Sequence, residues 1–489
     1  MRNAKEKNMM QKTDKTAPRA AKAGEGAIKR EDRTAGMSKA DRAAMEKYAA
    51  DYAGYLGIAK TERRAYAEAV RRIEKRGFRE LSTFKTLKPG DKVWRGFHGK
   101  TLFATVIGRR PLEAGVNVVG GHTDAPRIDL KPVPVAEKGG IAYFDTHYYG
   151  GIKKFHWVAH PLAIYGRICR KDGTGADVSI GDAAGDPVFM ISDILPHFGK
   201  DQASKPMSEG IAAENMDILA ATTPDPGADG DAKDKVKAHV LRLLAEKYGV
   251  AEDDLVSAEL EAVPAGMPRD CGLDRSMIAG YGHDDRVCAY AGLKALADLD
   301  GVPARTAVVL LCDKEEIGSV GASGMDSTFF ENSIAELVVR RNPKAGDIAV
   351  RRALEASRML SADVCAAADP MFPDADSTGN MARMNAGPCM IKYTGAGGKS
   401  GASDARAEFI ASLRGVFDSA GVAWQAGELG RCEKGGGGTI AKFMARYGMD
   451  VVDMGTPLLN MHAPWELASK FDCWMTYRAY AAFLGAKER

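Results

Sequence analysis

Apolar positions recur along this chain with two different periods, one typical of helices and one typical of strands. Beyond Ser38, which is placed to cap a helix, large apolar side chains return every three or four residues and predict one buried helical face. These side chains are Met45, Tyr48, Tyr52 and Tyr55. Similar patterns predict helices over 61–76, 287–299 and 334–340, and a long C-terminal helix from about 463 to 484.

Short apolar runs without a helical period predict buried strands between these helices. The run 306–312 is rich in β-branched residues and is bounded by polar ones, as expected for a central strand of an α/β sheet. The runs 116–119 and 359–362 have the same character. Because open α/β sheets bind ligands at the carboxyl ends of their strands, the polar residues that follow these runs are the first candidates for a functional site.

The middle of the chain differs in character from both flanks and contains a polar stretch rich in Pro, Gly and Asp. Its predicted elements are strands at 141–146, 162–169, 188–192 and 254–262, and a helix at 235–248. We therefore expect an inserted domain over 131–272, with 38–130 and 273–489 forming the main domain. Residues 1–37 have almost no large aliphatic side chains and are expected to be a disordered, basic N-terminal extension.

Charge and cysteine content narrow the class of protein. The 489 residues include 68 basic and 65 acidic side chains, and this near balance gives no reason to expect nucleic acid or an anionic membrane as a partner. No apolar run approaches the roughly 20 residues that a membrane helix needs. The eight cysteines form no Cys-x-x-Cys pair, which favours a reducing, cytoplasmic location over a disulfide scaffold.

Two adjacent carboxylates, Glu315 and Glu316, follow the run 306–312. Neighbouring acids beyond a buried strand repel each other unless a cation or a shared proton lies between them. The alternative is an acidic, solvated loop. His122 and Asp124 likewise follow the run 116–119, where the imidazole can bind a metal that the carboxylate helps to orient. A lone loop histidine is the alternative here.

Three further residues complete the set of candidates. Asp284 begins a predicted helix, where the helix dipole alone would also favour an acid. Asp363 follows the run 359–362, and His462 follows the apolar stretch 450–461. Two histidines, several carboxylates that could act as ligands and one spare carboxylate suit a pair of Zn²⁺-like ions, with the spare acid as general base.

Two other patterns are weaker. His156 and His160 are four residues apart, but Pro161 prevents a helix and no Glu follows His156, so a zincin motif is absent. The glycine run 435–438 lacks the Lys-Ser/Thr of a P-loop. Close approach of the backbone to a substrate is the favoured interpretation of the glycines, and a simple hinge is the alternative.

Five segments resemble the M18 family of metallopeptidases, the aspartyl aminopeptidases. They are GGHTDAPRIDLKP, GHDDRVCAYAGL, LLCDKEEIGSVGASGM, SADVCAAADP and NMHAPWELAS, in the family's order from about Met37 to the C-terminus. The segment THYYGGIKKF resembles a bacterial branch more than the animal enzymes. The resemblance implies a three-layer α/β/α zinc-peptidase catalytic domain with an inserted β-rich dimerisation domain. It also implies a homododecamer that is built from dimers.

The resemblance implies two Zn²⁺ per subunit, with Co²⁺ or Mn²⁺ as substitutes. The ligands that it implies are His122 and Asp363 for one ion, Glu316 and His462 for the other, and Asp284 as the bridge. Glu315 would be the general base, and Asp124 would orient His122. The peptide bond between Asp284 and Asp285 would be cis.

The implied reaction is removal of the N-terminal residue from peptides with a free N-terminus, with a preference for acidic (Asp/Glu) or otherwise polar residues. His197 would reach a neighbouring subunit's site, and Lys392 and Lys399 would contact substrate. Ala366 replaces a substrate-contacting histidine of the animal enzymes, which weakens the expectation of strict acidic selectivity. The alternatives are broader specificity, another zinc hydrolase on the same scaffold, such as a deacylase or carboxypeptidase, and a catalytically silent shell.

Overall fold

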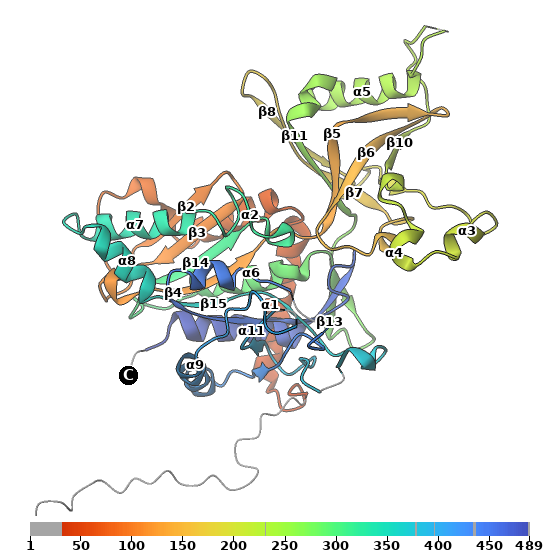
Figure 1. The fold of residues 1–489 in the computed structure, drawn as a ribbon. Coiled ribbons are helices and arrows are strands. Elements are labelled where there is room, and N and C mark those ends of the chain that lie inside the picture. The colour runs from red at the N-terminus through yellow and green to blue at the C-terminus, as the bar shows by residue number, and fades with distance from the viewer. Residues whose placement is uncertain (1–31, 230, 377–378, 396, 434–436, 488–489) are drawn as a thin grey trace, which may run out of the picture.

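The computed structural model describes residues 32–229, 231–376, 379–395, 397–433 and 437–487 (Figure 1). The predicted disordered extension over 1–37 therefore lies mostly outside the described residues. Within the described part of the chain, no helix combines the length and the apolar character that crossing a bilayer requires. All eight cysteines are described and are free thiols.

A nine-stranded sheet forms the centre of the larger body of the molecule. Its strands, in spatial order, are β1 (Arg79–Glu80), β2 (Lys92–Phe97), β3 (Thr101–Val106), β14 (Ala307–Cys312), β4 (Asn117–His122), β15 (Arg358–Ser361), β19 (Asp450–Gly455), β17 (Cys389–Ile391) and β18 (Gln425–Ala426). The four central strands β14, β4, β15 and β19 are parallel. Their carboxyl ends therefore meet at one edge of the sheet.

Helices cover both faces of this sheet, which gives three layers. In β14, Val309 packs into one apolar core while Val308 and Leu310 pack into the other, because successive side chains of a strand point to opposite faces. The helices on the first face are α1 (Lys39–Ile58), α2 (Glu62–Glu74), α6 (His283–Ala297), α9 (Ala407–Ser419) and α11 (Lys470–Leu484). Those on the second face are α7 (Phe329–Arg341), α8 (Asp347–Glu355) and α10 (Ala441–Ala445).

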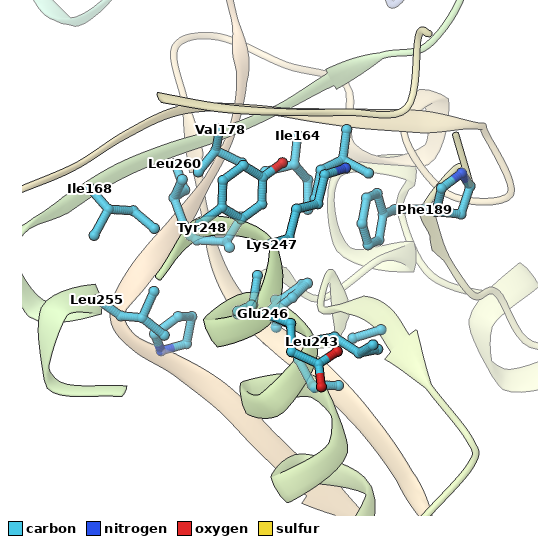
Figure 2. A pocket seen from close by; sticks show the side chains of 18 residues that line it. Ile164, Ile168, Val178, Phe189, Leu243, Glu246, Lys247, Tyr248, Leu255 and Leu260 are labelled. Carbon is cyan, nitrogen blue, oxygen red and sulfur yellow. The ribbon is translucent and has the colours of Figure 1, made fainter. Parts of the chain in front are cut away.

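A second, seven-stranded sheet projects from this body (Figure 1). Its order is β8 (Gly175–Ile180), β7 (Leu162–Cys169), β11 (Ala258–Pro264), β5 (Arg127–Lys138), β6 (Ile141–Tyr149), β10 (Ile218–Ala221) and β9 (Met190–Ile191). The helix α5 (Lys235–Tyr248) lies across one face of this sheet. Figure 2 shows the apolar cavity of about 440 Å³ that remains between helix and sheet, with Leu243 on the helix side and Ile164 and Val178 on the strands.

A five-stranded sheet joins the last part of the chain to the start of α6. Its strands are β12 (Arg269–Cys271), β13 (Met277–Gly280), β21 (Glu466–Ser469), β20 (Pro457–Leu459) and β16 (Cys365–Ala366). The pairing of β13 with β21 sets Gly280 opposite Glu466. His462 lies between β20 and β21, which pair with each other, and β21 also pairs with β13. This pairing holds the segment with His462 next to the turn that carries Asp284.

Several predicted elements differ from the structure. The C-terminal helix begins at Lys470 rather than near 463, because Glu466–Ser469 pairs as β21 and the Ser469 hydroxyl caps the helix. The first part of the predicted strand 254–262 is a 3-10 turn, Glu252–Ser257. The twelve-residue strand β5 and the helices α8 and α9 were not predicted from the sequence.

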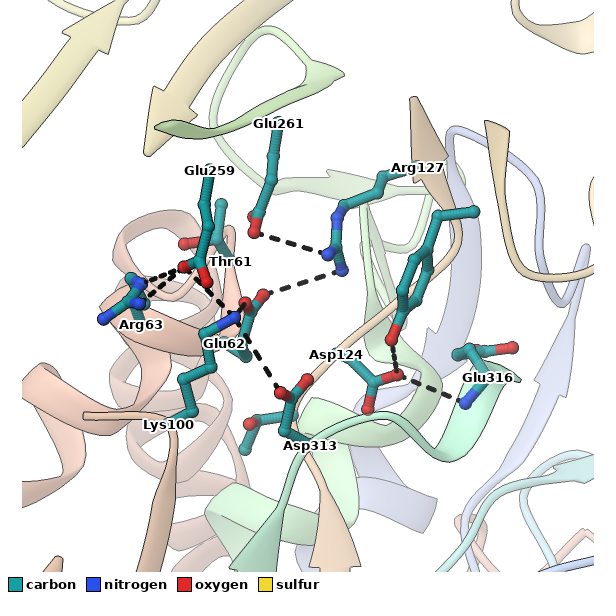
Figure 3. A network of polar contacts seen from close by, with 12 residues as sticks. Thr61, Glu62, Arg63, Lys100, Asp124, Arg127, Glu259, Glu261, Asp313 and Glu316 are labelled. Atoms are coloured by element: carbon teal, nitrogen blue, oxygen red, sulfur yellow. Dashed lines mark hydrogen bonds and ion pairs between the residues drawn. The ribbon is translucent and has the colours of Figure 1, made fainter. Parts of the chain in front are cut away.

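Buried charges fill the junction between the two large sheets (Figure 3). Glu62 is fully buried, with Oε1 2.8 Å from Lys100 Nζ and Oε2 3.6 Å from Arg127 Nη1. Arg127 also lies 3.4 Å from Glu261 Oε1 and 2.7 Å from Asp129 Oδ1. Carboxylates outnumber cations here, so each cation has more than one partner and the position of Arg127 is tightly constrained.

Candidate metal centre

The polar residues that follow the parallel strands meet at one edge of the nine-stranded sheet. His122 is the last residue of β4 and lies opposite Cys312, the last residue of β14. Glu315 and Glu316 lie in the turn after β14, and Asp363 lies two residues beyond β15. The predicted gathering of these side chains is therefore observed, and its cause is the parallel register of the central strands.

Asp284 lies between the two histidines. Its Oδ1 is 3.2 Å from His122 Nε2, and its Oδ2 is 3.2 Å from His462 Nε2. His462 Nε2 is also 3.5 Å from Glu316 Oε2. One carboxylate thus presents one oxygen to each imidazole, which is the arrangement that a bridging ligand requires. The peptide bond between Asp284 and Asp285 is cis, as expected from the family resemblance.

The remaining carboxylates surround the same centre. Potential ligand atoms of His122, Asp284 and Glu316 lie within 4.8 Å of one another, and so do those of His122, Glu315 and Asp363. Within the described residues, the buried oxygens Asp284 Oδ1 and Glu316 Oε1 accept no hydrogen bond. Buried carboxylate oxygens normally have a partner, so this donor set fits metal ions.

Both imidazoles are oriented by their Nδ1 atoms. His122 Nδ1 is 3.0 Å from the main-chain oxygen of Asp124 and 3.3 Å from its Oδ1. His462 Nδ1 is 2.8 Å from the main-chain oxygen of Gly151. A proton on each Nδ1 would leave the Nε2 lone pair directed at Asp284, as a metal-binding histidine requires.

The carboxylate of Asp124 also holds the turn that carries the two glutamates. Its Oδ1 accepts the N–H of Glu315 and its Oδ2 accepts the N–H of Glu316, both at 3.2 Å. Asp124 was expected only to orient His122. The structure adds contacts with the Glu315–Glu316 turn, which Figure 3 shows in part.

Without metal ions, the buried carboxylates of this cluster outnumber the positive charges beside them, and the pKa values of its side chains shift as a result. Burial is the main cause that raises the pKa of Glu315; the charge of His122 opposes it, the charges of Asp284 and Asp124 add to it, and the net pKa is about 7. Burial lowers the pKa of His462, but a hydrogen bond with Asp284 and the charge of Glu316 outweigh it and bring this pKa to about 10. Protons supply positive charge in the protein alone, a role that metal dications can take over.

A cavity of about 520 Å³ opens in front of these side chains. Besides the acidic groups and His462, its walls include Ile391, Thr394, Phe443 and one cation, Lys442. A Cβ placed on Gly438, another wall residue, would lie 3.7 Å from Lys442 Nζ. Residues 435 and 436 of the glycine run 435–438 lie outside the described residues, and Gly437 and Gly438 border the cavity.

The three predicted substrate-binding residues lie elsewhere. Lys392 is exposed, does not line the cavity and lies 3.8 Å from Asp404. Lys399 Nζ is 3.3 Å from the same aspartate and 3.7 Å from the centre of the Tyr393 ring. His197 is exposed in the loop after β9. The subunit by itself therefore does not bring these three side chains to the metal centre.

Three residues with close contacts to the centre were not predicted as site residues. Glu466 accepts the N–H groups of His462 and Asp284, Tyr149 donates to Asp124, and Lys442 lines the cavity. The spacing His-x-x-x-Glu could have indicated Glu466. No local pattern distinguishes Tyr149 or Lys442, because both come from other parts of the fold.

Known proteins are similar to this chain in sequence and in fold. A family model described as Aminopeptidase I zinc metalloprotease (M18) matches residues 55–484. A probable M18 family aminopeptidase 1 from Clostridium acetobutylicum is 46% identical over 440 residues, which is 88% of this chain and 93% of the relative. An M18-family aminopeptidase from Thermotoga maritima has a similar crystal structure, with a TM-score of 0.89, 40% identity and coverage of 94% of this chain and 100% of that one.

More distant structures share the fold alone. The yeast mApe1 dodecamer is 21% identical, with a TM-score of 0.74, and the match covers 91% of this chain and 97% of that one. The family model, the curated relative and the Thermotoga maritima structure agree with the motifs and with the observed cluster. The chain therefore belongs to the M18 family of zinc metalloproteases and is a metalloaminopeptidase, a hydrolase.

Proposed function

We propose that this metalloaminopeptidase uses a dinuclear zinc centre to release N-terminal residues from peptides, with a preference for acidic or otherwise polar ones. The proposed ligands are His122 and Asp363 for one ion, Glu316 and His462 for the other, and Asp284 as the bridge. The observation that supports this most directly is the placement of Asp284, which directs one carboxylate oxygen to each histidine at 3.2 Å.

Glu315 is proposed as the general base. It lies on the cavity wall beside His122 and Asp363 and is not needed as a ligand in this scheme. Zinc ions held there would polarise the peptide carbonyl and make water more acidic. Glu315 would take a proton from the attacking water as the water oxygen adds to the carbonyl carbon, and would then pass it to the leaving amine.

Lys442 supports the preference for an acidic substrate. It is a cation on a cavity wall that otherwise carries several carboxylates, so it offers a partner for a negatively charged N-terminal side chain. Lys392 and Lys399 both lie near Asp404 and away from the wall. We therefore assign the selective contact to Lys442 within the subunit, while His197, Lys392 and Lys399 remain candidates for contacts across an assembly.

Assembly into dimers and then a homododecamer is also proposed, with contacts made by the inserted unit at 131–272. The yeast mApe1 dodecamer shares the fold, and the exposed loop with His197 could reach a neighbouring subunit. The mass of the particle in solution tests this. A monomer at micromolar concentration would contradict it. The free thiols support the proposed cytoplasmic location.

A panel of aminoacyl chromogenic substrates tests the reaction. We expect turnover of free-amine substrates with bound Zn²⁺, Co²⁺ or Mn²⁺, and the highest kcat/KM for Asp or Glu. N-blocked substrates should not react. Equal rates on all side chains would favour the broad-specificity alternative, and cleavage of N-blocked substrates alone would favour a deacylase or carboxypeptidase.

A further inference from the structure

The end of strand β6 reaches from the second sheet into the metal centre. Three consecutive residues there, Tyr149, Gly150 and Gly151, each contact a different part of the cluster. They belong to the segment THYYGGIKKF, which has no role in the proposed reaction. Residues from the projecting sheet thus take part in building the site on the nine-stranded sheet.

Tyr149 acts on Asp124. The Tyr149 ring is buried, and its hydroxyl donates a hydrogen bond of 2.9 Å to Asp124 Oδ2. The same oxygen accepts the N–H of Glu316, while Oδ1 accepts the N–H of Glu315. Because Asp124 is fully buried, the tyrosine hydroxyl limits the rotation of the carboxylate that holds the turn.

The two glycines lie against the other side of the centre. The main-chain oxygen of Gly151 is 2.8 Å from His462 Nδ1, and a Cβ on Gly151 would lie 3.3 Å from that nitrogen. Gly150 has φ of +78°, and a Cβ there would lie 3.3 Å from the Cβ of Glu316. Both distances are tighter than most Cβ contacts, so a side chain at either position would press on Glu316 or His462 and force it to shift by a few tenths of an ångström.

We infer that Tyr149–Gly151 is a positioning element by which the second sheet holds the metal-binding side chains, with Tyr149 as the positioning residue for Asp124 and the Glu315–Glu316 turn. The inference rests on the proposed metal centre. Tyr149 does not line the cavity in front of the cluster, and its hydroxyl acts through Asp124. Residues that orient metal ligands in this way typically contribute about 10–100-fold to metal affinity or activity.

The ring of Tyr149 is itself held in place. The Arg127 guanidinium lies 3.8 Å from the ring centre, and Arg127 is fixed by Glu62, Glu261 and Asp129. The buried charges between the two sheets therefore constrain the hydroxyl that contacts Asp124. Correct seating of the second sheet thereby becomes a condition for a correctly formed metal centre.

The neighbouring tyrosine offers a matched control. Tyr148 is 40% exposed on the same strand, and its hydroxyl makes no hydrogen bond with the described residues. Tyr149→Phe and Tyr148→Phe each remove one hydroxyl. Zinc affinity of the full-length proteins is measured by competition with a chromogenic chelator, and the absorption of the Co²⁺-loaded proteins reports ligand geometry without any peptide.

We expect Tyr149→Phe to weaken zinc binding about 10-fold, to shift the Co²⁺ spectrum and to lower kcat about 10-fold with KM nearly unchanged. Tyr148→Phe should match the unmodified enzyme in all four measurements. Equal zinc affinity and equal Co²⁺ spectra for the two variants would overturn the inference. If unmodified enzyme binds zinc but cleaves no free-amine substrate, the proposed function fails, and the comparison of the two variants still decides the role of Tyr149.

A second variant tests the contact between the same element and His462. Gly151→Ala adds a methyl group against His462 Nδ1, and we expect at least a 10-fold loss of zinc affinity. Gly415→Ala, at an exposed position of α9 where an added Cβ meets nothing within 4 Å, is the control for the glycine-to-alanine change itself. If Tyr149→Phe does not fold, unchanged zinc affinity in Gly151→Ala would overturn the inference by itself.

Discussion

The carboxylate of Glu466 accepts the backbone N–H of His462 through Oε1 at 2.8 Å. Its other oxygen, Oε2, accepts the N–H of Asp284 at 3.1 Å. Glu466 is almost fully buried, and it is the first residue of β21. A single side chain therefore sets the distance between the backbone of the proposed bridging ligand and that of one histidine.

Replacing this side chain should disturb the centre without removing a ligand. In Glu466→Gln, one of the two backbone N–H groups faces an amide nitrogen, and a buried unpaired donor costs about 1–3 kcal/mol. We expect a lower Tm and weaker zinc binding, measured by thermal unfolding and chelator competition. Glu408→Gln, at a largely exposed side chain, is the control. Identical zinc affinity in both variants would contradict this role for Glu466.

The proposed base can be separated from the proposed ligands. Glu315→Gln keeps the size and polarity of the side chain but cannot accept the proton from water. We expect zinc content to remain close to that of the unmodified enzyme, while kcat falls by about 10²–10⁴-fold. Metal analysis and steady-state kinetics on the same preparation measure both quantities. Substantial turnover by the zinc-loaded variant would remove Glu315 from the mechanism.

The selectivity for acidic residues should depend on Lys442 more than on Lys392. Removing the charge in Lys442→Gln is expected to lower kcat/KM for Asp and Glu substrates about 10-fold, or about 1.4 kcal/mol, relative to an Ala substrate. Lys392→Gln should change this ratio little, because Lys392 does not line the cavity and lies 3.8 Å from Asp404. The reverse result would assign substrate recognition to Lys392, as the family resemblance implies.

Metal removal should affect stability as well as activity. Without cations, the buried carboxylates around Asp284 repel one another and destabilise the folded state. Metal ions that bind only the folded protein relieve this repulsion, and they raise Tm as their concentration rises. We expect chelation to abolish turnover and lower Tm, and added Zn²⁺, Co²⁺ or Mn²⁺ to restore both. Full activity after exhaustive chelation would contradict the metal-dependent mechanism.

The buried charge cluster between the sheets predicts a large effect of one substitution. Arg127→Met leaves Glu62, Glu261 and Asp129 without a shared cation, and breaking a buried pair in this way costs about 3–5 kcal/mol. Denaturant unfolding measures the loss. Arg63→Met, at a partly exposed cation paired with Glu259, should cost far less. Equal stability of the two variants would show that Arg127 does not hold the junction.

Local patterns predicted much of the main body and the helix that packs on the second sheet. Three predicted elements are close to the observed ones: the strand at 306–312, the helix after Ser38 and the helix at 235–248. Each of them buries one or both of its faces, so the spacing of its apolar residues indicates its type. The C-terminal helix was predicted to begin near residue 463, but it begins at Lys470. Residues 466–469 pair with β13, and nothing near them in the sequence indicates that partner.

The sequence by itself determined which residues follow buried strands, and the family motifs identified their chemistry. His122, Glu315, Glu316 and Asp363 were found in this way, because the end of a strand is marked locally by an abrupt change from apolar to polar residues. Only the tertiary structure decided the distances among them. It also placed Tyr149, Lys442 and Glu466 at the centre, since these contacts depend on the pairing of distant segments and on the seating of the second sheet against the first.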